Sequence, residues 1–423
     1  MSNYKIDTLC VQAGYQPKSG EARIPPVVQS TTFFYEKTKD MADLFDLKSD
    51  GYFYSRLANP TVAAFENKVA ALEGGVCAIG CSSGMAATSL TVFTVAGSGD
   101  NIVASSAIYG GSYNLFSTTL PKLGIECRFF DPDSPAEEIE KLIDGKTRLI
   151  FTETIANPAI IVLDFDKIAA IAKKHGVLFA VDNTLATPVL CRPKDFGANI
   201  VIHSSSKYLD GHAAALGGVI VDCGNFVFEG NDRYPSFNTP DESYHGLVYA
   251  QLPVAFGTKC RAQMMRDFGA VMSPQNGFIS YIGCDTLALR MERHSENAKK
   301  VAAYLSAHPK IEWINHPSLK ENKYHKTAQK YLPRGQGGMM SFGIKGDVEK
   351  CAAFMEALEM ITQETHVADV RSCVLHPAST THRQLSAEDL KKAGVPYNLI
   401  RLSVGIENAE DIIADLEQAL KKV

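Results

Sequence analysis

The sequence lacks the features that mark membrane proteins, nucleic-acid-binding proteins and secreted proteins. No apolar run approaches the roughly 18 residues that a membrane-spanning helix needs. The formal net charge is −5, so there is no basic excess of the kind that attracts nucleic acids or membrane surfaces. The first residues, Met-Ser-Asn-Tyr-Lys-Ile-Asp, contain no apolar segment typical of a signal peptide. We therefore expect a cytoplasmic protein whose partners are neither nucleic acid nor membrane.

Cysteine pairs at metal-binding spacing are also absent. Ten cysteines are scattered between Cys10 and Cys373, and none forms a Cys-x-x-Cys pair. Cys77 and Cys81 lie closest together, but no matching His or Cys pair follows them. We therefore expect neither a metal site nor a disulfide framework, and we interpret the cysteines as free thiols in a reducing cytoplasm.

Two common phosphate-binding motifs are missing. The chain contains no Gly-x-Gly-x-x-Gly, which argues against a dinucleotide-dependent dehydrogenase. The small-residue segment from Ser82 to Met85 is not followed by Gly-Lys-Ser or Gly-Lys-Thr, so it is not a Walker loop.

The composition is otherwise that of an ordinary globular protein, with 45% hydrophobic and 21% charged residues. A length of 423 residues predicts two or three domains. We expect an extended N-terminal arm over 1–58, a large α/β domain over 59–254, and a smaller C-terminal α/β domain with a connecting helix over 255–423. The arm lacks a helical period, and we expect it to pack on another subunit or on its own domain.

Short apolar strands alternate with helices in the middle of the chain. Asn59 followed by Pro60 predicts the start of a helix over 60–73, which Gly74-Gly75 ends. Strands are predicted at 78–80, 101–104, 148–153, 177–181 and 200–202, with helices at 84–95, 112–123 and 165–175. This alternation predicts a mainly parallel sheet covered on both faces. The aperiodic segment 224–250 is interpreted as a long functional or lid-like loop.

The remainder continues with a helical region over 255–306. Strands are then predicted at 338–344 and 399–404, and a final helix at 409–422.

A lysine follows the strand at 200–202. The segment His203-Ser-Ser-Ser-Lys207 places an amine and several hydroxyl groups at the end of a buried strand, where open α/β sheets bind ligands. Ser204-x-x-Lys207 also fits the pattern of Ser-x-x-Lys acyl-transfer hydrolases, but the Ser-Asp-Asn and Lys-Thr-Gly motifs of that class are absent.

The other strand ends carry complementary groups. Ser83-Gly84-Met85 opens a helix whose N-terminus can hold a phosphate. Tyr109 offers an aromatic ring and a phenol, Asn157 an amide, and Asp182 a carboxylate that can bind a protonated ring nitrogen. Together with Lys207, these groups suit one flat, phosphorylated aldehyde with a ring nitrogen, namely pyridoxal 5'-phosphate (PLP).

These residues resemble the Cys/Met-metabolism family of fold-type I PLP-dependent enzymes. The matching segments follow the family's order along nearly the whole chain: Tyr54-Ser-Arg56-x-x-Asn59-Pro60-Thr61, Ser83-Gly84-Met85, Tyr109-Gly110-Gly111, Glu153-x-x-x-Asn157-Pro158, Asp182-Asn-Thr184, Ser204-x-Ser206-Lys207-Tyr-Leu-x-Gly211-His212, Gly217-Gly218, His376-Pro-Ala-Ser-x-Thr381-His382 and Arg401-Leu-Ser-Val-Gly-Ile-Glu407.

The resemblance implies a role for each matching position. Lys207 would form the Schiff base with the cofactor and carry the substrate Cα proton, Asp182 would bind the pyridine nitrogen, and Tyr109 would stack on the ring and move protons. Arg401 would hold the substrate carboxylate with help from Asn157. The remaining cofactor contacts would come from Ser83, Gly84, Met85, Asn157, Thr184, Ser204 and Ser206. Tyr54 and Arg56 would reach the phosphate of a neighbouring subunit, Tyr54 also contacting substrate, in a homotetramer built from two active dimers.

Within the family, the residues most resemble the O-acetylhomoserine sulfhydrylase branch. This implies γ-replacement on O-acetyl-L-homoserine by sulfide or methanethiol, giving homocysteine or methionine and acetate. Methionine γ-lyase and cystathionine γ-synthase or lyase are the alternatives within the family. Methionine γ-lyases carry a cysteine where Gly111 stands, which counts against the lyase. One segment departs from many relatives, since His366-Val-Ala-Asp369 replaces Ser-Leu-Gly-Asp/Gly near the substrate carboxylate. The acyl group and the sulfur donor, including a sulfur-carrier protein, stay open.

Overall fold

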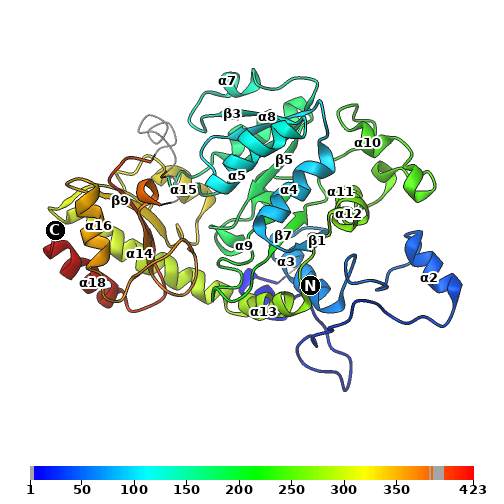
Figure 1. Ribbon diagram of the computed structural model, residues 1–423, viewed down its shortest axis with the longest axis horizontal. Helices are drawn as coiled ribbons and strands as arrows, with labels where there is room; N and C mark the ends of the chain where they lie inside the picture. The colour runs from blue at the N-terminus through cyan, green and yellow to red at the C-terminus, as the bar shows by residue number, and fades with distance from the viewer. Residues whose placement is uncertain (1–3, 381–382, 384–394) are drawn as a thin grey trace.

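The computed structural model describes residues 4–380, 383 and 395–423. Thr381 and His382, which end the motif that begins at His376, lie outside the described residues. Two sheets, one of seven strands and one of five, form the centres of two neighbouring parts of the molecule (Figure 1).

The larger sheet has the strand order β1-β7-β6-β5-β4-β2-β3. Its strands, in that order, are Cys77–Cys81, Gly218–Asp222, Ile200–His203, Leu178–Asp182, Thr147–Glu153, Asn101–Ser105 and Glu126–Phe130. β7 runs in the direction opposite to that of the other six strands of this sheet, which are parallel to one another. The prediction of a mainly parallel sheet is therefore confirmed. β3 and β7 were not predicted. β7 begins at a Gly-Gly pair, and glycine is depleted in strands.

Alternate residues of these strands face two hydrophobic layers, because side chains of a strand point to opposite faces. Ile150 and Phe179 pack with helices α3 (Pro60–Glu73) and α8 (Phe165–His175) on one face. Phe151 and Leu178 pack with α4 (Gly84–Val95) on the other face. The helices predicted at 60–73, 84–95 and 165–175 are thus confirmed. The segment predicted as a helix at 112–123 consists of α5 (Gly110–Asn114), a π-helical turn (Leu115–Thr119) and α6 (Leu120–Lys122).

The smaller sheet is mostly antiparallel, with the order β10-β11-β12-β9-β8. Its strands are Thr362–Gln363, Cys373–Leu375, Leu399–Ser403, Met339–Ile344 and Ile311–Asn315. Helices α16 (Val348–Glu356) and α18 (Ala409–Lys421) pack against it. The strands predicted at 338–344 and 399–404 and the final helix are confirmed.

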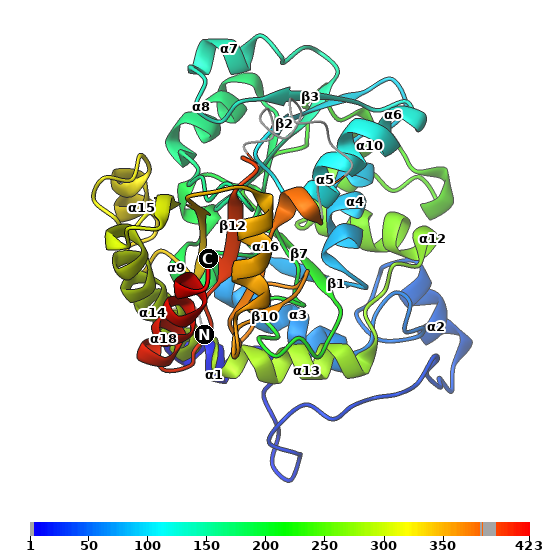
Figure 2. The same cartoon turned by 60° about the vertical axis from the view of Figure 1, so that its left-hand side comes forward.

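One long helix, α14 (Leu287–Ala307), belongs to both parts. Leu287 and Met291 near its start lie in a core layer of the larger sheet, whereas Val301 and Leu305 near its end lie in the core of the smaller sheet. Helix α13 (Pro274–Asp285) precedes it and runs beneath the larger sheet in Figure 2. The domain boundaries at residues 58 and 254 stay a prediction.

The N-terminal arm contains two helices that were not predicted, α1 (Ile6–Gln12) and α2 (Thr38–Phe45). They are too short to produce a clear helical period. Leu9 and Cys10 of α1 are buried in the same core layer as α3. The rest of the arm projects from the body (Figure 1), and Phe34 on it is 86% exposed.

The part of the segment 224–250 around Tyr234 does not form a lid over the predicted site. Tyr234 is fully buried, and its hydroxyl accepts a hydrogen bond from Leu178 N and donates one to Arg148 O. Phe228 and Phe237 stack with their ring centres 4.0 Å apart. Leu178 and Arg148 lie at the beginnings of β5 and β4, so the part of this segment around Tyr234 covers the edge opposite the one where Asp182 ends its strand.

Candidate active site

The predicted site residues gather at the carboxyl ends of the parallel strands. Glu153 ends β4, Asp182 ends β5 and His203 ends β6, and these three strands are neighbours. The end of β1 leads through Ser83 into α4 at the same edge. The smaller sheet contributes Arg401 from β12 and the segment before β11.

A tight turn holds Lys207 beside the end of β6. Lys207 N donates to Ser204 O, and Gly211 N donates back to Lys207 O at 2.7 Å. Arg290 also fixes the turn, because its Nη1 donates to Tyr208 O at 2.7 Å. Gly211 has φ = +76°, a conformation that glycine adopts without strain. The lysine backbone is therefore held before any ligand binds.

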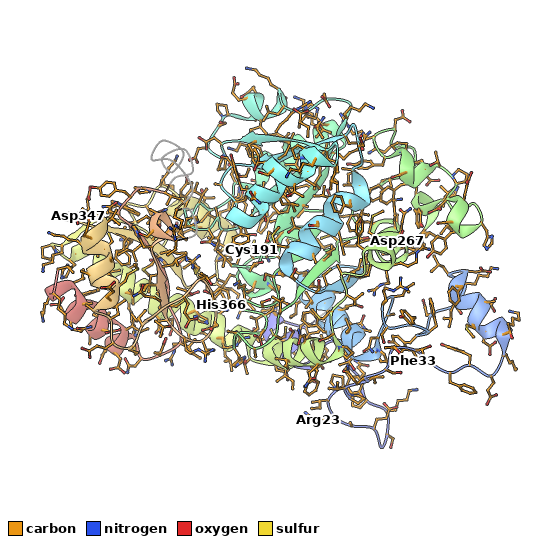
Figure 3. The ribbon with its side chains drawn as sticks, viewed as in Figure 1. Arg23, Phe33, Cys191, Asp267, Asp347 and His366 are labelled. Carbon is orange, nitrogen blue, oxygen red and sulfur yellow. The ribbon has the colours of Figure 1, made fainter. Side chains whose placement is uncertain are left out.

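The Lys207 amine faces His366 from the other part of the molecule. Its Nζ lies 3.1 Å from His366 Nδ1. Burial, and then the nearby Arg401 charge, lowers the pKa of Lys207 to about 8. The neutral, nucleophilic form of this amine is therefore far more populated near neutral pH than in an ordinary lysine, although the ammonium form still predominates at pH 7. Figure 3 shows His366 in the middle of the molecule, between the part that carries Asp347 and the part that carries Asp267.

Arg401 is a buried guanidinium that has no acidic partner among the described residues. Among the described residues its side chain donates to main-chain oxygens alone, from Nη2 to Thr365 O and His366 O at 3.3 Å each. Its Nε is also buried, and it has no hydrogen-bond partner among the residues that the structure describes. Burial lowers the pKa of Arg401 to about 10. Burying a cation without a paired anion costs free energy, so this site favours an anionic ligand. A carboxylate can accept two parallel hydrogen bonds from the guanidinium group.

Asp182 is a buried carboxyl group held by the turn that follows it. Thr184 N donates to its Oδ1 at 2.9 Å, and Thr184 Oγ1 accepts from Ser204 N at 2.8 Å. Burial raises the pKa of Asp182. Burial and then Asp182 itself raise the pKa of Glu153, which is the register partner of Asp182.

Behind Asp182 lies a fully buried polar network that the sequence analysis did not identify. Glu73 Oε1 accepts from Asn183 Nδ2 at 2.8 Å and lies 2.7 Å from His203 Nε2. Asn183 in turn accepts from Thr154 Oγ1 at 2.7 Å. This network ties the end of α3 to the ends of β4, β5 and β6, and so it fixes the backbone that carries Asp182.

The N-terminus of α4 forms a cradle for an anion. Ser83 caps the helix by accepting from Ala86 N, and the N–H groups of the first turn point out of the helix. Gly84 lies so close to Ser204 that a Cβ at position 84 would stand 2.7 Å from Ser204 Cβ. Only glycine lets the backbone and the Ser204 hydroxyl meet at this point.

The Tyr109 ring lies at the opening of the site and is half exposed. Its backbone N donates to Glu153 Oε1 at 2.7 Å, which links the loop to the end of β4. A Cβ at Gly111 would lie 2.4 Å from Tyr109 Cε1, so a larger residue at 111 requires the ring to move.

Three further predicted residues lie nearby with different bonding. The Oδ1 of Asn157 is buried and has no partner among the described residues, so it is available to a ligand. The Ser206 hydroxyl donates to Gly217 O and accepts from Gly217 N. Met85 contacts Ser112 Oγ through its sulfur, 3.9 Å away.

Tyr54 and Arg56 are not brought to Lys207 within the chain. Tyr54 lies on the arm, where it bridges to Thr32, and the Arg56 guanidinium lies 5.1 Å from its ring. Arg56 Nη1 donates to Arg266 O at 2.5 Å. These contacts hold both side chains within the arm and against the segment that carries Arg266.

The residues around Lys207 fit PLP. The buried, unpartnered Asn157 Oδ1 and Arg401 Nε, the cradle at Gly84 and the carboxyl of Asp182 are available to its ring, its phosphate and an amino-acid substrate. In the part of the chain that the structure describes, no cluster of three or more His, Cys, Asp or Glu side chains could hold a metal ion. All ten cysteines are free. Residues 4–380, 383 and 395–423 contain no helix long and apolar enough to cross a membrane.

The fold and the site define a fold-type I PLP-dependent enzyme. The chain matches the family of Cys/Met metabolism PLP-dependent enzymes over residues 7–421, and it belongs to that family.

Several relatives are similar over nearly their whole length. O-acetyl-L-homoserine sulfhydrylase of Leptospira meyeri is 43% identical, covering 100% of this chain and 98% of the relative. Homocysteine/cysteine synthase of Saccharomyces cerevisiae is 41% identical, covering 99% and 98%. A solved structure of a candidate O-acetylhomoserine (thiol)-lyase from Campylobacter jejuni has a TM-score of 0.95 and 40% identity, covering 99% of this chain and 100% of that one. It contains N'-pyridoxyl-lysine-5'-monophosphate.

Besides that buried network, two residues without a predicted role contact the predicted site residues directly. Glu153 belongs to a motif of the family, and in the structure it holds the Tyr109 loop. His366 was noted only as a departure from relatives, and its contact with Lys207 joins residues 159 positions apart. A histidine where many relatives carry serine indicates that this position differs from theirs, but it does not indicate that the side chain contacts Lys207.

Proposed function

We propose that this chain catalyses a PLP-dependent γ-replacement on O-acetyl-L-homoserine with sulfide or methanethiol, giving homocysteine or methionine plus acetate. The observation that carries the proposal is the pairing of a buried Lys207 amine with a buried Arg401 guanidinium that has no acidic partner among the described residues. An α-amino acid has the complementary groups. Full-length identity of 41–44% to sulfhydrylases and homocysteine synthases supports the ester and the thiol.

The residues of the chain take distinct roles in this proposal. Bound PLP would supply an electron sink adjacent to the substrate Cα. Lys207 would hold the cofactor covalently and then accept the Cα proton at Nζ. Asp182 would hold the ring nitrogen, and the α4 N-terminus with Ser204 and Thr184 would bind the phosphate.

The substrate side would be formed by Arg401, Asn157 and Tyr109. Arg401 and Asn157 would fix the carboxylate, so that every substrate molecule binds with its ester group in the same orientation. The Tyr109 ring would lie over the cofactor. Its hydroxyl is a candidate to move a proton while acetate leaves Cγ and the thiol adds there.

The activity is tested by supplying substrates separately to the purified holoenzyme. We expect O-acetyl-L-homoserine with sulfide to give homocysteine and acetate, detected by mass spectrometry, and methanethiol in place of sulfide to give methionine. O-succinyl-L-homoserine tests the acyl group. Release of 2-oxobutyrate from methionine alone, with no product from the ester and sulfide, would contradict the proposal and favour the γ-lyase.

The oligomeric state, the cellular location and the sulfur donor are part of the same proposal. Tyr54 and Arg56 sit on the projecting arm, which supports a dimer in which they complete the partner's site, and two such dimers would form a homotetramer. The ten free cysteines agree with a reducing cytoplasm. A sulfur-carrier protein is the alternative donor, to be compared with free sulfide in the same assay.

A further inference from the structure

The ring of His366 lies between an amine and a carboxylate. Its Nδ1 is 3.1 Å from Lys207 Nζ. Its Nε2 is buried, has no hydrogen-bond partner among the described residues, and lies 3.9 Å from Asp369 Oδ2. With the proton on Nε2, facing the carboxylate, Nδ1 is left as an acceptor for the amine.

The backbone around His366 is fixed, so this position of the ring is built into the fold. His366 O accepts hydrogen bonds from Arg401 Nη2 and from Cys373 Sγ, each at 3.3 Å. Two residues later, the buried Ala368 N donates to Ser403 Oγ at 2.8 Å. Asp369 is fixed as well, since its Oδ1 accepts from Arg371 N at 2.6 Å.

The charges around the pair are known from every side. The cations are Lys207 itself, Arg401 from β12, and Arg371, whose Nη2 donates to Asp369 Oδ2 at 3.3 Å. The acidic groups near the ring come from two segments, at Glu364 and Asp369 and at Asp210. The Cys373 thiol faces them from β11, and burial raises its pKa to about 11, so it stays neutral. Burial, followed by the charge of Lys207, lowers the pKa of His366. The ring is therefore neutral, and able to accept a proton, at neutral pH.

We propose that His366 is a second proton carrier in this site, which takes a proton from the Lys207 ammonium at Nδ1 and later returns it. The Nζ–H bond breaks, its electron pair stays on Nζ, and an Nδ1–H bond forms. The positive charge moves from Lys207 to the imidazolium, where Asp369 stabilises it.

This inference rests on the proposed function, because a γ-replacement is a reaction in which such a proton relay is useful. A γ-replacement removes one proton from Cα and another from Cβ of the same substrate. A single amine can remove both only if it gives up the first proton before it takes the second. His366 offers an acceptor 3.1 Å from Nζ, and a relay would let Lys207 act twice in one turnover.

Proton exchange in D2O tests the relay without the ester or the thiol. The holoenzyme is incubated with L-norvaline, an amino acid with no leaving group at Cγ, and deuterium incorporation at Cα and at Cβ is followed by NMR. His366→Asn keeps an acceptor near Nδ1 but cannot carry the proton. We expect Cβ exchange to fall on the order of a hundredfold, with little change at Cα. Equal losses at both carbons, or no loss at either, would overturn the proposal.

A measurement on the cofactor-free protein tests the contact itself. Trace acetylation at a series of pH values, followed by peptide mass spectrometry, gives the midpoint at which Lys207 becomes reactive. In a buried site, loss of the acceptor disfavours the ammonium, so His366→Leu is expected to lower this midpoint. His366→Asn should leave it close to that of the wild type. An unchanged midpoint in His366→Leu would overturn the proposal.

Asp369→Asn is the second variant, should the His366 variants fail to fold. It keeps an acceptor for Arg371 N but removes the negative charge that pairs with Arg371 Nη2 and that stabilises the imidazolium. Cβ exchange should therefore again fall more than Cα exchange. His212→Asn is the matched control, because its ring contacts Asp210 O rather than Lys207. Norvaline exchange is independent of ester and thiol, so failure of the sulfhydrylase assay and failure of the relay are separate results.

Discussion

Glu153 and Asp182 are register partners at the ends of β4 and β5, and both of these neighbouring carboxyl groups are buried. Burial, followed by the nearby Asp182 charge, raises the pKa of Glu153 and so favours its protonated form. Asp182 is the better placed of the two to hold a negative charge, since Thr184 N donates to it. A protonated ring nitrogen of a bound cofactor would stabilise that charge further.

Replacing Asp182 by Asn should weaken PLP binding. The amide keeps the bond from Thr184 N but cannot supply the charge, and a charge-assisted hydrogen bond is worth about 1.5–3 kcal/mol. We expect a Kd for PLP roughly tenfold to a hundredfold higher, measured by absorbance titration of the apoenzyme. Asp222→Asn is a matched control, because Asp222 is a buried strand-end aspartate at the opposite edge of the same sheet. Unchanged affinity in Asp182→Asn would exclude the role of ring-nitrogen partner.

The stability of the apoenzyme should fall as pH rises, through Glu153. Its folded pKa is raised above the unfolded value, so the folded protein binds the extra proton and loses stability between about pH 4.3 and the raised pKa. The slope reaches at most about 1.4 kcal/mol per pH unit for one proton.

Glu153→Gln mimics the protonated form and keeps an acceptor for Tyr109 N. We expect urea unfolding midpoints of this variant to depend less on pH between 5 and 8 than those of the wild type. An identical pH dependence in the two proteins would mean that Glu153 carries no proton in the folded state.

The sequence predicted those parts of the molecule that local signals determine. The helix at 60–73 begins at an Asn–Pro pair and ends at a glycine with φ = +69°, and both signals lie within the segment itself. The strand ends that bear Asp182 and Lys207 could be predicted because apolar runs stop sharply before polar residues. A parallel sheet then brings these ends to one edge.

Contacts between distant segments could not be predicted in this way. The helix α1 has only seven residues, and its place in the core depends on packing against α3 and α13. The 224–250 segment appeared irregular because its order comes from buried aromatic side chains and from Tyr234, not from a repeating pattern. The contact between Lys207 and His366 arises only when the smaller sheet packs beside the larger one.

Arg401→Lys should raise the KM for the amino-acid substrate much more than it lowers kcat. Lysine keeps the charge but loses the planar fork that holds a carboxylate with two parallel bonds. Loss of one charge-assisted bond of about 1.5–3 kcal/mol corresponds to a KM roughly tenfold to a hundredfold higher. Initial rates across a range of substrate concentrations measure both constants.

Arg148→Lys serves as the control for this change. Arg148 is also buried, but it pairs with Asp100 at 2.7 Å near the opposite edge of the sheet. A KM that rises equally in both variants would indicate a general loss of structure and would remove the carboxylate role from Arg401.

Mixing two inactive variants should restore activity if Arg56 completes the site of a partner subunit. Lys207→Ala alone should lose activity, because the amine is gone, and Arg56→Ala should bind PLP weakly, because a phosphate contact is gone. In a mixed dimer, one site would combine the intact Lys207 of one chain with the intact Arg56 of the other. Random pairing at equal amounts gives about a quarter of the sites in this form. The two proteins would be unfolded together, refolded with PLP and assayed, with each variant refolded alone as control. Activity no higher than that of the separate variants would place Arg56 outside the shared site, and the arm would then serve only to join the subunits.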